Sequence, residues 1–143
     1  VYRLVDGYNI IFAWDELKAI AAEDVNAARE RLVNIMSNYQ GVRRCHLILV
    51  FDAYKVKGGT GSVEKRHGIH IVYTREAETA DMYIEQASYD LSRKHRVRVA
   101  TSDGMEQMII LGHGAERMSA TELKWEVEQA DEHLHGIIQN LQL

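Results

Sequence analysis

Four aspartates each lie just after a different predicted strand, in the turn or at the start of the helix that follows it. They are Asp6, Asp52, Asp81 and Asp103. Ligand sites in parallel sheets lie outside the carboxyl ends of the strands, so we expect these four side chains to gather at one edge. Clustered carboxylates repel one another unless they are protonated or neutralised by a cation. Oxygen ligands without cysteine suit Mg²⁺ or Mn²⁺, and such ions activate water for phosphodiester hydrolysis or assist phosphoryl transfer.

Each member of this acidic cluster has its own expected role. We expect Asp6, Asp81 and Asp103 to hold the metal ion, and Asp52 to complete or orient the cluster. Asn9, three residues after Asp6, is expected to contact the ligand or to hold Asp6 in place. Taken singly, every one of these residues also fits ordinary turn or helix-cap chemistry. Their common placement at strand ends favours the metal interpretation.

Basic and aromatic side chains occur near the same strand ends. Those that we expect to contact RNA are Lys55, Lys57, Arg66, Arg75, Tyr8 and Tyr54. Lys and Arg neutralise phosphates, and an aromatic ring stacks on an unpaired base. This combination favours single-stranded RNA over a duplex. The alternative is that the lysines belong to an exposed loop and only keep it soluble, and the net charge of −4 argues against indiscriminate binding to nucleic acid.

Strand and helix signals alternate along the chain. Apolar runs predict strands over residues 1–5, 47–51, 69–73, 97–101 and, briefly, near 117–118. Caps and apolar periodicity predict helices after Asp24, after Thr79, over 104–111 and after Ser119, with a last amphipathic piece at 134–141. The Gly- and Lys-rich residues 53–68 are expected to form a loop. This alternation predicts one domain over residues 1–143, a three-layer α/β/α sandwich around a mostly parallel sheet of four to five strands.

Composition and missing motifs exclude several classes of protein. Hydrophobic residues make up 46% of the chain and charged residues 27%, which is typical of a folded domain. No run approaches the ~20 apolar residues that span a membrane. The lone Cys45 excludes an internal disulfide, and without a visible secretory leader it indicates a reducing, cytoplasmic setting, in a bacterium or a plastid. The chain has no GxGxxG fingerprint, complete P-loop or GxSxG elbow, so we expect no small organic cofactor.

Four short motifs occur in a distinctive order. They are Val5–Asn9 (VDGYN), Phe51–Tyr54 (FDAY), Glu78–Asp81 (ETAD) and Thr101–Asp103 (TSD). Their order and spacing resemble the YacP-like NYN family of PIN-fold ribonucleases, and the resemblance runs through nearly the whole chain. It implies a PIN-like fold and a metal-dependent endoribonuclease. The acidic positions of the family carry over to Asp6 and Asp81 most directly, then to Asp103 and Asp52, and Asn9 matches the polar partner of the first aspartate.

The resemblance also implies a substrate and a partner. The resemblance implies mRNA as substrate and the ribosome as partner, with the basic residues of 53–68 as a contact. The predicted function is therefore hydrolytic cleavage of single-stranded RNA with Mg²⁺ or Mn²⁺ as cofactor. The alternative, from another class, is a non-catalytic RNA- or ribosome-binding adaptor that keeps the fold. Binding by such an adaptor would not respond to chelators or to Asp→Asn changes at the cluster.

Overall fold

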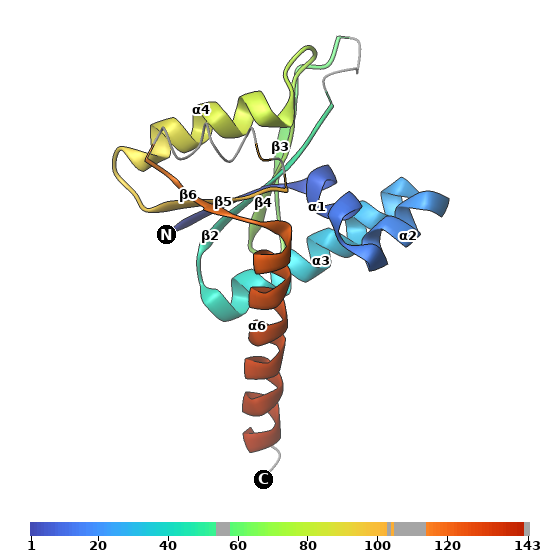
Figure 1. Cartoon of the computed structure of the whole chain (residues 1–143), viewed down its shortest axis with the longest axis vertical. Coiled ribbons are helices and arrows are strands. Elements are labelled where there is room, and N and C mark those ends of the chain that lie inside the picture. Colours follow the sequence, from blue (N-terminus) through green and yellow to red (C-terminus); the bar gives the residue numbers. More distant parts are fainter. Residues whose placement is uncertain (54–57, 103, 105–113, 142–143) are drawn as a thin grey trace.

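A six-stranded sheet forms the centre of the molecule. The computed structural model describes residues 1–53, 58–102, 104 and 114–141 (Figure 1). The strands are β1 (Tyr2–Asp6), β2 (His46–Phe51), β3 (Ser62–Arg66), β4 (Ile69–Tyr73), β5 (Val97–Ala100) and β6 (Glu116–Met118). Their order is β3-β4-β2-β1-β5-β6, and every neighbouring pair is parallel except β3 and β4. Because β1, β2, β4 and β5 run in one direction, their carboxyl ends share one edge of the sheet.

Helices cover both faces of this sheet (Figure 1). Those in the described part of the chain are α1 (Gly7–Ala13), α2 (Asp15–Glu23), α3 (Val25–Arg43), α4 (Ala80–Ser92) and α6 (Ala120–Leu141). Helices α1, α2, α3 and the first half of α6 bury their apolar residues in one core, whereas α4 packs into a second core on the other face. The layers are therefore helices, sheet and helix. The predicted α/β class and mostly parallel sheet are confirmed.

The continuous apolar runs of the strands follow from this double coverage. In β2, Leu47, Leu49 and Phe51 belong to the core under α3, and the intervening Val50 belongs to the core under α4. Side chains alternate between the faces of a strand, so a strand buried on both faces needs apolar residues at successive positions. The same demand explains the neighbouring Leu4 and Val5 of β1, which are buried on opposite faces.

One expectation about the sheet was wrong. Residues 53–68 were expected to form a loop and the sheet to have four to five strands, but β3 lies within this segment and brings the strand number to six. β3 is an antiparallel edge strand with four of its five residues exposed, so it carries no apolar alternation that the sequence could reveal. Its pairing is set by the following turn, in which His67 and Gly68 both have positive φ (52° and 84°), as a two-residue type I′ hairpin requires.

The predicted caps are confirmed, but two helices were missed. Asp24 accepts a hydrogen bond from the backbone N of Asn26 (2.9 Å) at the start of α3, and Ser119 and Glu122 form a capping box at the start of α6. The helices α1 and α2 were not predicted, because they are short and meet at Trp14. The Trp14 indole N–H donates to the carbonyl oxygen of Ala120 (2.8 Å), so their junction depends on a distant segment.

The last helix is continuous where two pieces were expected. Residues 134–141 belong to α6, and residues 131–141 are exposed because this half of the helix projects beyond the sheet (Figure 1). The helix predicted over 104–111 lies outside the described residues, apart from Gly104. Among the described helices, none has the length and apolar character needed to cross a membrane.

Candidate active site

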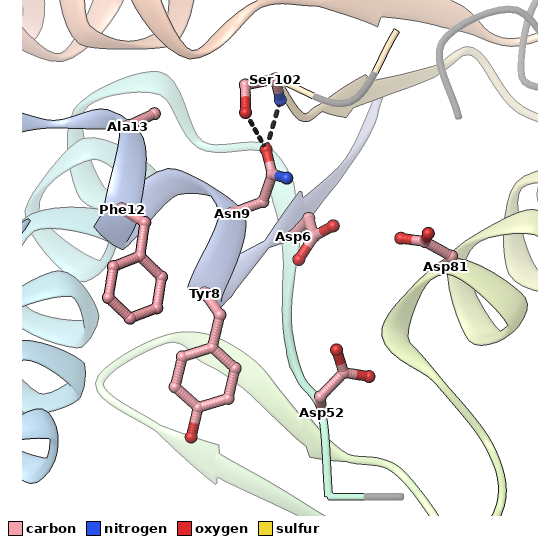
Figure 2. A pocket seen from close by; sticks show the side chains of 8 residues that line it. All are labelled: Asp6, Tyr8, Asn9, Phe12, Ala13, Asp52, Asp81 and Ser102. Atoms are coloured by element: carbon pink, nitrogen blue, oxygen red, sulfur yellow. Dashed lines mark hydrogen bonds between the residues drawn. The ribbon is translucent and has the colours of Figure 1, made fainter. Parts of the chain in front are cut away.

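An open pocket of about 410 Å³ lies at the carboxyl ends of β1 and β2, beside the N-termini of α1 and α4 (Figure 2). Its lining residues are Asp6, Tyr8, Asn9, Phe12, Ala13, Asp52, Asp81 and Ser102. Three of the four predicted aspartates therefore meet in one pocket. The fourth, Asp103, lies outside the described residues, although Ser102 immediately before it lines the pocket.

Asp6 is the last residue of β1 and is buried, with 5% of its surface exposed. The chain turns directly into α1 at Gly7, which lies against Phe51 and the backbone of β2. A Cβ atom at Gly7 would come within 2.4 Å of Phe51 Cε1 and 2.9 Å of the Val50 carbonyl oxygen. Only glycine permits this close approach, so the Asp-Gly pair serves to place Asp6 at the floor of the pocket rather than to form an ordinary surface turn.

Asp52 and Asp81 are brought together by the start of α4. A carboxylate oxygen of Asp52 accepts a hydrogen bond from the backbone N of Ala80, the first residue of that helix. The Thr79 hydroxyl caps the same helix by accepting from the backbone N of Met82 (3.1 Å). Asp81 lies in the first helical turn and is exposed toward the pocket (Figure 2). Two carboxylates from distant parts of the chain therefore flank one helix N-terminus.

The pKa of Asp52 reflects this crowding. Burial raises the pKa of its carboxyl group above the usual value, the hydrogen bond from the Ala80 backbone lowers it, and the negative charge of Asp81 raises it further. Desolvation and a like charge both disfavour the ionised form. The pocket thus keeps partly buried carboxylates close to one another, and a bound cation would relieve their mutual repulsion.

Thr74 is a positioning residue that the sequence analysis missed. Its buried hydroxyl oxygen accepts a hydrogen bond from the backbone N of Ala53 (2.8 Å), and its own backbone N donates to the Phe51 carbonyl oxygen (3.1 Å). These two bonds hold the chain on both sides of Asp52. A threonine one residue after a strand gives no signal of this role, because the partner lies 21 residues away.

Asn9 also acts through its neighbours. Its side-chain oxygen accepts hydrogen bonds from the Thr101 hydroxyl (3.2 Å) and from the backbone N and hydroxyl of Ser102 (Figure 2). These bonds connect α1 to the segment that follows β5. The structure therefore gives Asn9 contacts that hold Ser102 at the pocket, and Asp103 is the next residue in the sequence.

The predicted RNA contacts are only partly brought to the pocket. Tyr8 lines it, and its hydroxyl accepts a hydrogen bond from Arg29 of α3 (2.7 Å). The sequence analysis missed this cation because Arg29 lies 21 residues away on another helix. Arg75 is exposed just after β4 and lines a neighbouring hollow with Gly61 and Glu78. The predicted contacts Tyr54, Lys55 and Lys57 lie outside the described residues.

Arg66 differs from the expectation. It is part of β3 rather than of a loop, and it pairs with Ile69 at the end of β4 that is remote from the carboxylates. Its guanidinium group forms an ion pair with Glu30 (3.0 Å), and it does not line the pocket. Placing Arg66 beside the acidic cluster was therefore wrong, since the hairpin carries it back along the sheet. Its contribution to RNA binding stays a prediction.

The donor set fits a divalent cation in chemical type. Figure 2 shows the side chains of Asp6 and Asp81 pointing toward each other, with Asp52 below them in the view. Carboxylate oxygens are the ligands that Mg²⁺ and Mn²⁺ prefer. In the part of the chain that the structure describes, however, there is no group of three or more Asp, Glu, His or Cys side chains placed so that they could hold a metal ion together. The fourth aspartate of the predicted cluster, Asp103, lies outside these residues.

The sheet and its acidic pocket place the protein in the class of PIN-like α/β domains. The chain superposes on a crystal structure of Rae1 (YacP) from Bacillus subtilis, the W164L mutant, with a TM-score of 0.86 and 36% identity, covering 99% of this chain and 83% of that one. A second structure of Rae1 (YacP) from Bacillus subtilis gives a TM-score of 0.82, 36% identity, and coverage of 99% and 81%.

Residues 3–142 match the YacP-like NYN domain, and the chain belongs to this family. It is 40% identical over 142 residues to the uncharacterized protein YacP of Bacillus subtilis (strain 168), an alignment that spans 96% of this chain and 81% of that protein. The resemblance inferred from the four sequence motifs is thus confirmed. Membership of this nuclease-like family supports an RNase-type function.

Proposed function

We propose that this protein is a metal-dependent endoribonuclease that hydrolyses phosphodiester bonds in single-stranded RNA. The observation that carries the proposal is that Asp6, Asp52 and Asp81, from three separate elements, line one open pocket. Carboxylates gathered in this way are characteristic of sites that cleave phosphodiesters. The nuclease-like family to which the chain belongs supports the same conclusion.

We assign the metal ligands from this pocket and from the sequence. Asp6 and Asp81 would hold Mg²⁺ or Mn²⁺, with Asp103 as a further ligand and Asp52 completing the group. The protein's own residues prepare these carboxylates: Ala80 and Thr74 fix the segment around Asp52, and Asn9 fixes Ser102. A divalent cation, when bound, supplies Lewis-acid chemistry by neutralising phosphate charge and lowering the pKa of water.

The RNA strand would enter along the open side of the pocket. The half-buried Tyr8 ring offers an aromatic face, and Arg29 beside it offers positive charge. Arg75, which lies outside the pocket, would contact the phosphate backbone, and we assign the same role to Lys55 and Lys57 from the sequence. An extended single strand presents both its phosphates and its base faces, whereas a duplex hides the base faces. This is the reason for proposing a single-stranded substrate.

We further propose that the substrate is mRNA and that the ribosome is the partner, on the family resemblance alone. The rival function is a non-catalytic adaptor that binds RNA or the ribosome. Cleavage assays separate the two functions, because the adaptor binds without cutting.

The test compares the wild-type protein with Asp6→Asn on labelled single-stranded RNA, the same sequence as DNA, and an RNA duplex, all in Mn²⁺. A second arm uses translating ribosomes with a defined mRNA. In this arm Asp6→Asn, rather than a chelator, is the control for metal dependence, because removing Mg²⁺ causes ribosomes to dissociate. We expect internal cuts in single-stranded RNA in at least one arm, lost in Asp6→Asn. Binding without wild-type cleavage in both arms would establish the adaptor instead.

A further inference from the structure

Phe12 is a large apolar side chain that is exposed inside the acidic pocket. Its exposed fraction is 54%, whereas Ile10 and Ile11 of the same helix are fully buried. A single exposed apolar residue is ordinary on a protein surface. Phe12 stands out because it shares the pocket with Asp6, Asp52 and Asp81.

The neighbour of Phe12 is an aromatic ring whose position is fixed. Tyr8 lies one helical turn earlier, and residues four apart share one face of a helix. Its hydroxyl is held by Arg29 (2.7 Å), and its ring meets Phe51 edge-on, with centroids 5.2 Å apart and planes inclined at 61°. Tyr8 is therefore a rigid partner beside a more exposed ring.

Figure 2 shows that the pocket has two chemically different sides. The rings of Tyr8 and Phe12 leave α1 on the same side, and Asp81 lies on the other side of the pocket with Asp6 between them. An acidic side suits the phosphate through a bound cation, and an aromatic side suits a flat base. Both sides line the same pocket, so one nucleotide chain bound there would meet both of them.

We propose that Phe12 and Tyr8 form a wall on which an unpaired nucleobase beside the cleaved phosphate stacks, with Phe12 as the more exposed contact. This inference rests on the proposed RNA-cleaving function and adds a basis for its substrate preference. Every base has a π-face, so stacking tolerates base identity. Phe12 has no hydrogen-bonding group, and it therefore distinguishes a splayed base from a paired base rather than one base from another.

The pattern of burial separates this role from a structural one. Ile10 and Ile11 pack into the core under α3 and secure α1, whereas Phe12 is absent from both cores. Truncation of Phe12 should therefore leave the fold and Asp6 undisturbed. Tyr89 provides a matched control, because it is an aromatic residue with 47% of its surface exposed on α4 and does not line the acidic pocket.

The kinetic experiment compares wild type, Phe12→Ala, Phe12→Trp and Tyr89→Ala on single-stranded RNA. The substrates carry either intact bases or one abasic nucleotide moved across the positions flanking the cut. Phe12→Ala should raise KM about tenfold, the scale of one lost base stack, with kcat within about twofold of wild type. Phe12→Trp should restore KM, and Tyr89→Ala should leave both constants unchanged. An abasic nucleotide at the stacking position should raise KM for wild type but have no further effect in Phe12→Ala.

A binding measurement separates failure of this inference from failure of the proposed function. RNA labelled with 2-aminopurine is titrated into Asp6→Asn and into Asp6→Asn combined with Phe12→Ala, so that no cleavage occurs. Fluorescence quenching that requires Phe12 supports the stacking wall even if the wild type cuts no RNA. Equal quenching with and without the Phe12 ring overturns the wall, as does an unchanged KM in Phe12→Ala. Absence of both binding and quenching also overturns it.

Discussion

Charged side chains gather in two regions of this sheet, and the regions differ in how the charges are balanced. Beside α6, arginines and glutamates alternate in an arginine–glutamate network (Arg3, Arg98, Glu116 and Glu126). Glu126 accepts hydrogen bonds from Arg98 (3.1 Å) and from the Tyr39 hydroxyl (2.8 Å). Within the described residues of the acidic pocket, by contrast, neither Asp52 nor Asp81 forms an ion pair with a Lys or Arg.

The pKa of one carboxyl group in each region is shifted, and the two shifts are opposite in direction. The hydrogen bond from Arg96 holds the pKa of Glu116 below its usual value, whereas burial and the charge of Asp81 hold the pKa of Asp52 above its own. The network pairs arginine with glutamate charges and connects α6 to β1, β5 and β6, although among the described residues Arg3 Nη1 and Arg98 Nε have no hydrogen-bond partner. The pocket keeps charges of one sign together, which costs stability unless a ligand neutralises them. We conclude that the network serves the fold and the pocket serves a ligand.

Asp81→Asn should have the largest effect, and it should affect the cleavage activity of the acidic pocket rather than the stability of the fold. We expect cleavage to fall more than about a hundredfold, since outer partners of metal ligands alone contribute 10- to 100-fold. The melting temperature should stay the same or rise, because a repulsion with Asp52 is removed. Single-turnover cleavage and thermal unfolding measure the two effects. Asp90→Asn on the same helix is the control, and an Asp81→Asn protein that cuts at nearly the wild-type rate would contradict the assignment.

Glu126→Gln should have the opposite effects, lowering stability rather than cleavage. It removes a charge shared by Arg98 and Arg3 (3.1 and 4.0 Å). Breaking a fully buried pair costs about 3–5 kcal/mol, and all three of these side chains are only partly buried, so we expect a loss of about 2 kcal/mol. Urea unfolding measures this loss, with the exposed Glu128→Gln as control. Loss of cleavage in the folded variant without loss of stability would reverse the roles of the two regions.

Thr74→Val should affect both stability and cleavage, because Thr74 belongs to the fold and also holds the segment that carries Asp52. The change leaves the Ala53 backbone N without its acceptor, at a cost of about 1.5 kcal/mol. It also frees the segment that holds Asp52, so cleavage should fall severalfold. Thr74→Ser keeps the oxygen and should restore both quantities. If Thr74→Val lowers stability and spares cleavage, the position of Asp52 does not depend on Thr74.

The pH dependence of Asp52→Asn gives the smallest expected effect. Because the folded-state pKa of Asp52 is raised, the folded protein binds a proton more readily than the unfolded chain between about pH 4 and the raised value. The stabilisation from that proton is lost as the pH rises through this window. Asp52→Asn cannot titrate, and its amide oxygen can still accept from Ala80. Its unfolding free energy relative to wild type should therefore grow from acid to neutral pH, and a decrease would contradict the raised pKa.

What the sequence could reveal was determined by local patterns. The strands that carry Asp6 and Asp52 are apolar runs buried on both faces, and the carboxyl ends of parallel strands meet whatever the rest of the chain does. The caps Asp24 and Thr79 act on residues two and three positions away. Features of this kind can be predicted from neighbouring residues alone.

The remaining features depend on partners that are distant in the sequence. Thr74 acts on Ala53, and Arg29 acts on Tyr8. β3 is polar and is defined by its pairing with β4, which also carries Arg66 away from the pocket. Phe12 could be recognised as a pocket residue only after α1 had placed it one turn beyond Tyr8. In each case the functional position follows from tertiary contacts rather than from residue type.

Mn²⁺ binding tests the central claim most directly. The free ion is measured by electron paramagnetic resonance while Mn²⁺ is titrated into wild type, Asp6→Asn and Asp81→Asn, with Asp90→Asn as control. We expect saturable binding in wild type and Asp90→Asn, and a large loss of affinity in both pocket variants. Equal Mn²⁺ affinity in all four proteins, or no binding in wild type, would contradict the conclusion that these carboxylates hold a divalent cation.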